Sequence, residues 1–222
     1  MIKEVIQDIQ SELPGGVRLV AVSKYHPASA IQEAYDAGQR VFGENHVQEL
    51  MSKVYELPKD IEWHFTGHLQ TNKVKYIAPF IGLIHAVDTE KLLREIDRQG
   101  KRIGRPVPCL LQLHIAQEQT KYGFTPDEMK SFLSTGVHQE LFHAKICGLM
   151  CMATFTDDTE QIDREFALAR QIFEEVKTSF FPENDDFKEL SMGMSDDYQI
   201  ALRHGSTLVR IGTRIFGERV YG

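Results

Sequence analysis

The chain has 222 residues, of which 42% are hydrophobic and 26% charged, a composition typical of a globular protein with a sizeable core. Its net charge of -7 and isoelectric point of about 5.7 argue against a protein that binds a nucleic-acid backbone, because that function concentrates Lys and Arg on one surface. Three cysteines in apolar runs indicate neither a disulfide framework nor a zinc knuckle, and no apolar run approaches the ~20 residues that span a bilayer, so a reducing, cytoplasmic setting without a membrane anchor is expected.

The first residues form an amphipathic, acidic segment that is unlike a secretory or transit peptide. Short β-like runs then alternate with amphipathic helical stretches. The predicted strands cover residues 18–23, 40–44, 62–66, 83–87, 108–115, 145–150, 189–192 and 207–211. The helices predicted between them, from apolar residues at three- and four-residue spacing, include 28–37, 47–56, 89–99, 126–134 and 159–178. The glycines that indicate helix ends are Gly38, Gly100, Gly136 and Gly205.

This alternation, which no linker or low-complexity segment interrupts, predicts a single domain over residues 1–222 that begins with a helix. About eight βα units in roughly 200 residues favour a closed (β/α)8 barrel, and an open doubly wound sheet is the competing topology. Only the barrel brings the first and the last strand together. The topology therefore decides whether a residue after the first strand can share a site with the C-terminal glycine turn.

Lys24 stands where the first apolar strand runs into the breaker His26-Pro27. Val20 and Val22 lie on one side of a strand with period two, so the Lys24 amine would emerge from an apolar surface. Burial of that kind favours a neutral, nucleophilic amine, whereas at a pKa of ~10.4 only about 0.04% of an ordinary lysine is neutral at pH 7. Lys24 is therefore a candidate for covalent bonding to a carbonyl group, and a solvated loop lysine is the alternative.

The last predicted strand runs into a glycine turn and a short helix start at Gly212-Thr213-Arg214. Backbone N–H groups and the helix dipole favour a phosphate there, and in (β/α)8 barrels the phosphate pocket often follows the seventh and eighth strands. After the seventh strand, Ser195 is placed to cap a helix that begins at Asp196. We call the turn Gly212-Thr213-Arg214 the phosphate cradle. An amine after the first strand and this cradle after the last strand together describe a receptor for a phosphorylated aldehyde.

Other patterns allow more than one interpretation. Asn45, after the second strand, can hydrogen-bond a planar ligand or form a turn. His64 and His68 have four-residue spacing, but Gly67 marks a strand end, so they do not indicate a metal site, and His68 can instead cap or line the mouth of the site. No Ser-His-Asp order, nucleophile elbow or CxxC pair occurs in the sequence, which argues against hydrolase and thiol-redox functions.

Taken together, these motifs resemble the pyridoxal phosphate homeostasis protein family, also described as alanine racemase N-terminal domain-like or proline synthase co-transcribed, over essentially the whole chain. The segments that carry the resemblance are Ala21-Val22-Ser23-Lys24 and residues 42–49, 63–73 and 190–218. The resemblance implies a single modified (β/α)8 TIM barrel like the N-terminal domain of fold-type III pyridoxal 5'-phosphate (PLP) enzymes. It also implies PLP as the cofactor, with Lys24 as the lysine of the internal aldimine.

By position, Arg210 corresponds to the residue that faces the pyridine nitrogen. The other contacts that the resemblance implies are Asn45 on the ring and, on the phosphate, Gly212, Thr213 and one of Ser191 and Ser195. A guanidinium only donates hydrogen bonds and keeps its proton, so a pyridine nitrogen facing Arg210 stays unprotonated. The ring is then a poor electron sink, which suits a carrier, although fold-type III racemases tolerate the same arrangement. The departures from the family pattern are Tyr25, His26 and His46, which concern the polarity of the rim.

The resemblance therefore implies a protein without established catalysis that holds PLP on Lys24 and buffers it or delivers it to apo forms of PLP-dependent enzymes. A fold-type III amino-acid racemase or decarboxylase is the alternative; such relatives carry a further C-terminal β domain, whereas this chain is expected to stop at Gly222. A class I aldolase-like barrel, whose lysine binds the substrate and which needs no cofactor, is a third reading. A monomer is expected, because a small barrel without an appended domain needs no partner to complete its pocket.

Overall fold

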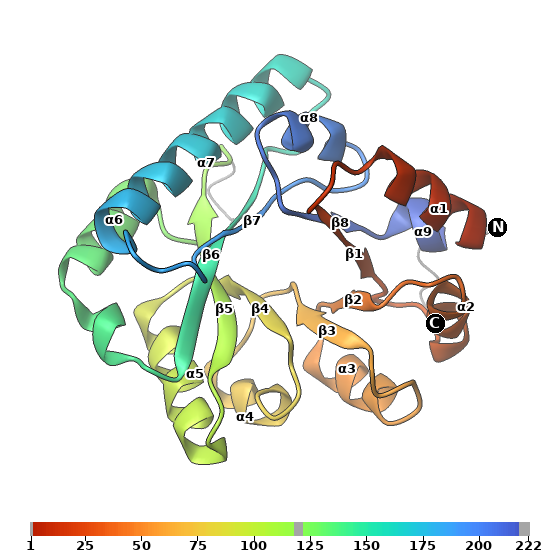
Figure 1. Cartoon of the computed structure of the whole chain (residues 1–222), viewed down its shortest axis with the longest axis horizontal. Coiled ribbons are helices and arrows are strands. Elements are labelled where there is room, and N and C mark those ends of the chain that lie inside the picture. The colour runs from red at the N-terminus through yellow and green to blue at the C-terminus, as the bar shows by residue number, and fades with distance from the viewer. Residues whose placement is uncertain (1, 118–121, 218–222) are drawn as a thin grey trace.

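Eight parallel strands form a closed barrel in the order β1 to β8 in the computed structural model, which describes residues 2–117 and 122–217 (Figure 1). Strand β8 pairs with β1, with Leu208 opposite Arg18 and Ile211 opposite Ala21. The closed barrel is thereby confirmed and the open sheet excluded. The strands, whose predicted bounds differ from these by at most two residues, are β1 (Arg18–Val22), β2 (Val41–Glu44), β3 (Glu62–Phe65), β4 (Leu83–Val87), β5 (Val107–His114), β6 (Ala144–Met152), β7 (Glu189–Ser191) and β8 (Leu208–Ile211).

Helices surround the strands, and Figure 1 shows α1 beside α9, although these two lie near opposite ends of the chain. An ion pair of 3.0 Å between Arg214 Nη2 and Glu12 Oε1 joins the two helices. The helices are α1 (Ile2–Glu12), α2 (Ala28–Asp36), α3 (Val47–Val54), α4 (Val74–Ile77), α5 (Glu90–Ile103), α6 (Pro126–Ser134), α7 (Thr159–Phe180), α8 (Tyr198–Arg203) and α9 (Thr213–Phe216), with 3-10 turns at Thr71–Lys73 and Val137–Glu140. The single domain is predicted over residues 1–222, and one segment that carries the family resemblance is residues 190–218. The last residue of that segment, Glu218, lies outside the described residues.

The prediction that Gly100 ends a helix is wrong. Helix α5 continues to Ile103 and ends at Gly104, which has the left-handed φ of 66° that favours glycine at this position. A Cβ atom on Gly100 would lie 2.8 Å from both the Cβ atom and the carbonyl oxygen of His143. Gly100 is therefore a close-packing position between α5 and the segment before β6. The other three predicted helix ends are confirmed. Gly38, Gly136 and Gly205 each follow a helix and have a positive φ.

Two clusters of apolar side chains form the core. The larger lies between the strands and the surrounding helices, and the smaller consists of strand residues only. The smaller cluster fills the barrel interior, because side chains at alternate strand positions point inward. Its buried members are Val20, Leu83, Ala86, Leu110, Met150 and Leu208. Val20, expected on the apolar side of the first strand, is buried in this cluster.

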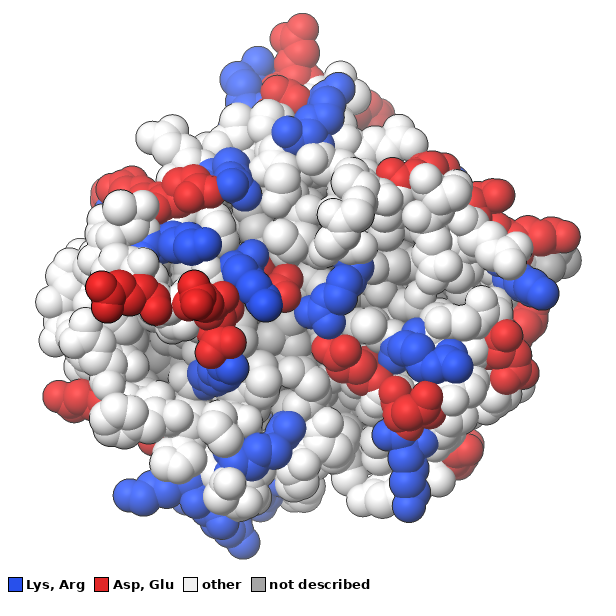
Figure 2. All heavy atoms as spheres, viewed as in Figure 1, with Lys and Arg blue, Asp and Glu red and all other residues white. Residues whose placement is uncertain are grey.

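Charged side chains of both signs are interspersed over the face of the molecule that Figure 2 presents, and neither sign forms a continuous patch there. Several of the charges are paired, for example Arg40 with Asp60 at 3.2 Å and Lys145 with Asp186 at 2.9 Å. Within residues 2–117 and 122–217, no helix has both the length and the apolar character needed to cross a membrane.

Candidate functional site

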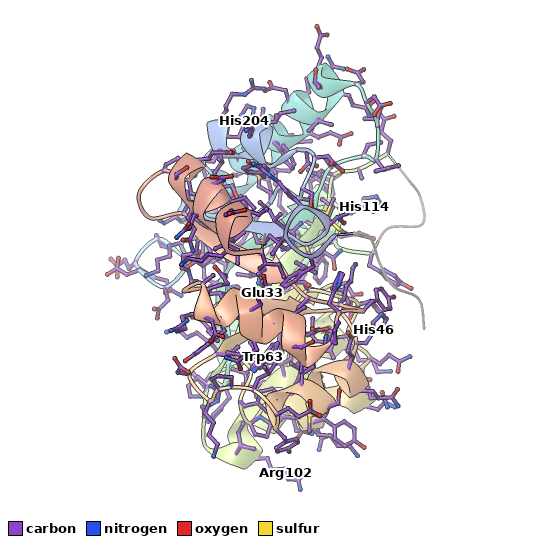
Figure 3. All side chains as sticks on the ribbon, turned by 90° about the vertical axis from the view of Figure 1, so that its right-hand side faces the viewer. Glu33, His46, Trp63, Arg102, His114 and His204 are labelled. Atoms are coloured by element: carbon purple, nitrogen blue, oxygen red, sulfur yellow. The ribbon has the colours of Figure 1, made fainter. Side chains whose placement is uncertain are left out.

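The carboxyl ends of the strands mark one side of the molecule. Figure 3 shows His46, which follows β2, and His114, the last residue of β5, on the same side. Because all eight strands are parallel, the segments that follow them gather at this end of the barrel. In (β/α)8 barrels this end carries the functional site.

A cavity of about 560 Å³ opens at this end and is lined by residues that end or follow β1, β2, β3, β6, β7 and β8. Most of the predicted cofactor-binding residues line it: Lys24, Asn45, Ser195, Arg210, Gly212 and Thr213. Ser191, the remaining predicted residue, lies outside the lining. The amine after the first strand and the glycine turn after the last strand thus share one cavity, as a closed barrel requires.

Lys24 lies in a tight turn directly after β1. The His26 N–H donates to the Ser23 carbonyl at 3.1 Å, which closes the turn around Lys24 and Tyr25. Tyr25 has a φ of 66° and is, in the described part of the chain, the residue other than glycine with a positive φ. Val22, at the end of the strand, lines the cavity together with Lys24, which is half-buried.

Arg210 is held rigidly in the wall of the cavity, where its exposure is 6%. Its Nη1 donates to the Ser191 hydroxyl at 2.6 Å and its Nη2 donates to the Cys151 carbonyl at 2.9 Å. Burial lowers the pKa of the guanidinium from its ordinary value, and nearby Cys151 and Asp197 oppose that effect. The two bonds engage two of the five N–H donors of the guanidinium and fix its plane.

The glycine turn approaches β1 closely. A Cβ atom on Gly212 would lie 2.9 Å from the carbonyl oxygen of Val22, so a larger residue would push the turn away from the strand that leads to Lys24. Gly212 precedes Thr213, the first residue of α9. The first N–H groups of a helix have no partner within the helix and carry partial positive charge, so the turn can hold an anionic group.

Two serines were candidates for the phosphate, and the structure separates them. Ser191 is fully buried, and its hydroxyl contacts Arg210 and, at 2.9 Å, the Nδ1 atom of His85. Ser195 lines the cavity. The prediction that Ser195 caps the next helix is wrong, because α8 begins at Tyr198 with Asp197 as its N-cap residue. The Asp197 carboxylate accepts the Met194 N–H at 2.6 Å, which closes a turn between the serine and the helix.

Asn45 lines the cavity and its side-chain oxygen accepts a hydrogen bond of 2.7 Å from the Thr66 hydroxyl. Thr66 itself is a lining residue that the sequence prediction missed, although its place directly after β3 is the available signal. Asp197, also missed, lines the same cavity, and burial raises the pKa of its carboxyl group. His26 stacks on Phe216 with ring centroids 5.2 Å apart, and burial lowers the pKa of its imidazole.

The two histidines with four-residue spacing lie apart from the cavity lining. His64 is fully buried, with its ring nitrogens 2.9 Å from His85 Nε2 and from Glu62 Oε1. His68 lies 2.9 Å from Asp88 Oδ2 and stacks on the Tyr122 ring at 4.1 Å between centroids. No group of three or more side chains suited to hold a metal ion occurs among residues 2–117 and 122–217.

Known proteins are similar to this chain in sequence and in fold. The family model described as "Alanine racemase, N-terminal domain" matches residues 1–220. The pyridoxal phosphate homeostasis protein of Aquifex aeolicus (strain VF5) is 38% identical over 206 residues, which are 92% of this chain and 88% of that protein. The protein of the same name from Escherichia coli (strain K12) is 39% identical over 215 residues, 94% of this chain and 88% of that protein.

Solved structures agree. PipY of Synechococcus elongatus PCC7942, with PLP bound, has a TM-score of 0.88 and 37% identity, and the match covers 98% of this chain and 100% of that chain. Alanine racemase of Streptomyces coelicolor A3(2) has a TM-score of 0.80 at 16% identity, over 97% of this chain and 57% of that chain, which is a likeness of fold alone. The chain therefore belongs to the pyridoxal phosphate homeostasis proteins, within the family of alanine racemase N-terminal domains.

Proposed function

We propose that this protein binds PLP covalently through Lys24 and acts as a carrier that buffers the cofactor or delivers it to apo forms of PLP-dependent enzymes. The observation that carries the proposal is that Lys24 and the Gly212 turn line one cavity. That cavity offers an amine for an aldehyde and backbone N–H groups for a phosphate, the two functional groups at which PLP is most readily held. PipY, a relative of similar length, has been solved with PLP bound.

Each lining residue has a role in this proposal. The Lys24 amine condenses with the aldehyde carbon, and the carbonyl oxygen leaves as water. The backbone of Gly212 and Thr213 holds the phosphate. Ser195 joins them, in preference to Ser191, because the Ser191 hydroxyl is engaged by Arg210 beneath the cavity wall. The two remaining contacts are Arg210 toward the ring nitrogen and Asn45 toward the ring.

Arg210 supports the role of a carrier. Bound PLP would be a weaker electron sink for amino-acid chemistry with its ring nitrogen unprotonated than with that nitrogen protonated. A guanidinium donates hydrogen bonds and gives up no proton, so Arg210 keeps that nitrogen an acceptor. Its bonds to Ser191 and to the Cys151 carbonyl prevent it from turning away. We expect the PLP-loaded protein, incubated with single amino acids in deuterated water, to show no exchange at Cα at an enzymatic rate; exchange at such a rate would support a racemase.

The setting is part of the same proposal. We propose a monomer in the reducing cytoplasm, since the barrel closes on itself through the pairing of β8 with β1 and Cys109, Cys147 and Cys151 are free thiols. Light scattering at micromolar concentration is expected to give the mass of one chain. A stable dimer in that measurement would contradict the proposed monomer and leave the PLP proposal to its own test.

The absorbance spectrum tests the covalent role of Lys24. Protein loaded with PLP is expected to show a visible band from the conjugated C=N bond, and Lys24→Ala is expected to lose it. Lys59→Ala, which removes an exposed lysine before β3, is the matched control and should keep the band. A Lys24→Ala protein with the full band would overturn the assignment. A wild-type protein whose lysine reacts with carbonyl substrates but never shows the pyridine chromophore would instead indicate an aldolase-like barrel.

A further inference from the structure

A buried ion cluster lies directly behind Lys24. Its members, called here the Lys53 cluster, are Lys53 and Glu49 of α3 and Glu44 of β2. The Lys53 ammonium, 5% exposed, donates to Glu44 Oε1 at 2.6 Å, to Glu49 Oε1 at 2.6 Å and to the Ser23 carbonyl at 2.9 Å. An ammonium has three N–H donors, so these three bonds use all of them.

The Lys53 cluster holds the backbone on both sides of Lys24. The Ser23 carbonyl, which Lys53 binds, belongs to the peptide unit before Lys24. The N–H of Tyr25, in the peptide unit after Lys24, donates to Glu49 Oε1 at 2.6 Å, the same oxygen that Lys53 binds. One cation therefore connects both peptide units that flank the reactive lysine.

The held turn is strained. A non-glycine residue in the left-handed region is sterically disfavoured and persists only where its surroundings enforce it. Tyr25 has this conformation, with a φ of 66°, at the position where a turn of this kind ordinarily takes Gly or Asn. The Tyr25 N–H donates to Glu49, and the Tyr25 hydroxyl lies 2.9 Å from the Nε2 atom of His46, the residue before α3. The start of α3 thus contacts both the backbone and the side chain of Tyr25.

Stability alone does not account for the Lys53 cluster. Glu44 is fully buried, and its Oε2 atom has no hydrogen-bond partner among the described residues. Burying charged groups costs free energy that their mutual attraction often fails to repay, so a buried ion pair is weak evidence for a stabilising role. What this cluster does achieve is a fixed geometry, since the Ser23 hydroxyl also donates to Glu44 Oε1 at 2.6 Å.

We propose that Lys53 and Glu49 are positioning residues, which hold the strained turn at Tyr25 so that the Lys24 amine meets the aldehyde carbon of a ligand seated in the phosphate cradle. The proposal rests on the proposed function, in which Lys24 binds PLP covalently. Its specific consequence is that the Lys53 cluster serves the covalent bond and not the cradle, because its contacts lie on the β1 side of the cavity and none of them involves Gly212 or Thr213.

Two ligands distinguish the contribution of the Lys24 amine from that of the phosphate cradle. PLP uses both the Lys24 amine and the cradle, whereas pyridoxine 5'-phosphate has an alcohol in place of the aldehyde and can use only the cradle. The variants are Glu49→Ala, which removes the acceptor of the Tyr25 N–H, and Glu49→Gln, whose amide oxygen can still accept it. Lys53→Met removes the cation, and Glu33→Ala removes an exposed glutamate of the neighbouring helix α2, labelled in Figure 3.

Glu49→Ala is expected to weaken PLP binding about tenfold or more, the effect of losing a charge-assisted hydrogen bond. It should also slow the appearance of the visible band, while its affinity for pyridoxine 5'-phosphate stays within about twofold of wild type. Glu49→Gln should restore most of the PLP affinity and Glu33→Ala should match wild type. Lys53→Met should behave as Glu49→Ala does. If Lys53→Met does not fold, the comparison of Glu49→Ala with Glu49→Gln still tests the proposal, because the Glu49 side chain is partly exposed and its replacement disturbs the core less.

Two outcomes would overturn the inference: a Glu49→Ala protein that captures PLP as fast and as tightly as wild type, or one that loses both ligands to the same extent, which would show a general structural role. A wild-type protein that never forms the visible band is a different result. It would contradict the proposed function itself, before any variant is compared.

Discussion

Arg210 donates a hydrogen bond of 2.6 Å to the hydroxyl of Ser191, and this bond is one end of a polar chain through the barrel. Ser191 Oγ lies 2.9 Å from His85 Nδ1, His85 Nε2 lies 2.9 Å from His64 Nδ1, and His64 Nε2 lies 2.9 Å from Glu62 Oε1. Four of these five residues are buried, and burial lowers the pKa of both histidines. The orientation of Arg210 at the cavity is thus tied to side chains deep in the barrel.

The chain of bonds predicts one tautomer for each of these histidines. The Glu62 carboxylate only accepts, so a neutral His64 donates to it from Nε2 and has Nδ1 free to accept, which requires His85 to carry its proton on Nε2 and to accept at Nδ1 from the Ser191 hydroxyl. His64 then accepts at Nδ1 and donates from Nε2 to Glu62, whose pKa this contact lowers to about 2. Nitrogen-15 NMR at pH 8, above the ordinary histidine pKa of 6.5 that burial lowers further in both residues, should show both rings neutral and protonated on Nε2. A proton on Nδ1 of His85 would contradict the direction of the chain.

Ser191→Ala is predicted to lower the free energy of unfolding by about 1–3 kcal/mol, because it leaves both a guanidinium N–H and an imidazole nitrogen buried without a partner. Urea unfolding of the protein without ligand measures this loss. Ser206→Ala is the matched control, since Ser206 is a buried serine of the same region that bonds only to backbone carbonyls. Ser206→Ala should lower the free energy of unfolding less than Ser191→Ala does. Equal losses would show that breaking the polar chain costs no more than removing another buried serine hydroxyl.

The sequence predicted the barrel well because the signals are local and repeat. Short apolar runs such as 18–23 predict strands, and apolar residues at three- and four-residue spacing predict helices. Closure of the barrel then placed Lys24 and Gly212 in one cavity. The helix α4 (Val74–Ile77) was missed because a single turn is too short to show a period.

Contacts that depend on tertiary packing could not be predicted. Ser191 and Ser195 are four residues apart and would share a face of a continuous strand, but Gly193 has a φ of 94°, which ends the alternation and sends the two side chains to different places. Lys53 and Glu49 have the spacing of an ordinary surface pair on a helix, and only the packing of α3 against β2 and the turn after β1 buries Lys53 and half-buries Glu49. In neither case does the local sequence pattern show what surrounds the side chain.

Gly67→Ala is predicted to displace Asn45 from the cavity wall. A Cβ atom on Gly67 would lie 2.5 Å from the carbonyl oxygen and 2.8 Å from the Cα atom of Asn45, and backbone atoms this close must move. Overpacking of this kind costs about 1–3 kcal/mol. Thermal unfolding should show the loss, and binding of pyridoxine 5'-phosphate should weaken with it. Gly15→Ala, where a Cβ atom meets nothing within 4 Å, is the control and should leave both measurements unchanged; a Gly67→Ala protein as stable as that control would contradict the prediction.

Glu44 is predicted to make the stability of the protein fall as the pH rises toward neutrality. Burial raises the pKa of its carboxyl group to about 7, against the opposing effects of Lys53 and Ser23. Between the ordinary pKa of 4.5 and about 7 the folded protein therefore binds more protons than the unfolded chain, so this contribution is fully present below pH 4.5 and is lost through pH 7. The full change corresponds to roughly 3 kcal/mol. Urea unfolding of wild type and Glu44→Gln between pH 5 and 8 should give curves that diverge, with the wild type losing stability relative to the variant as the pH rises. Parallel curves would mean that Lys53 keeps Glu44 ionised throughout this range.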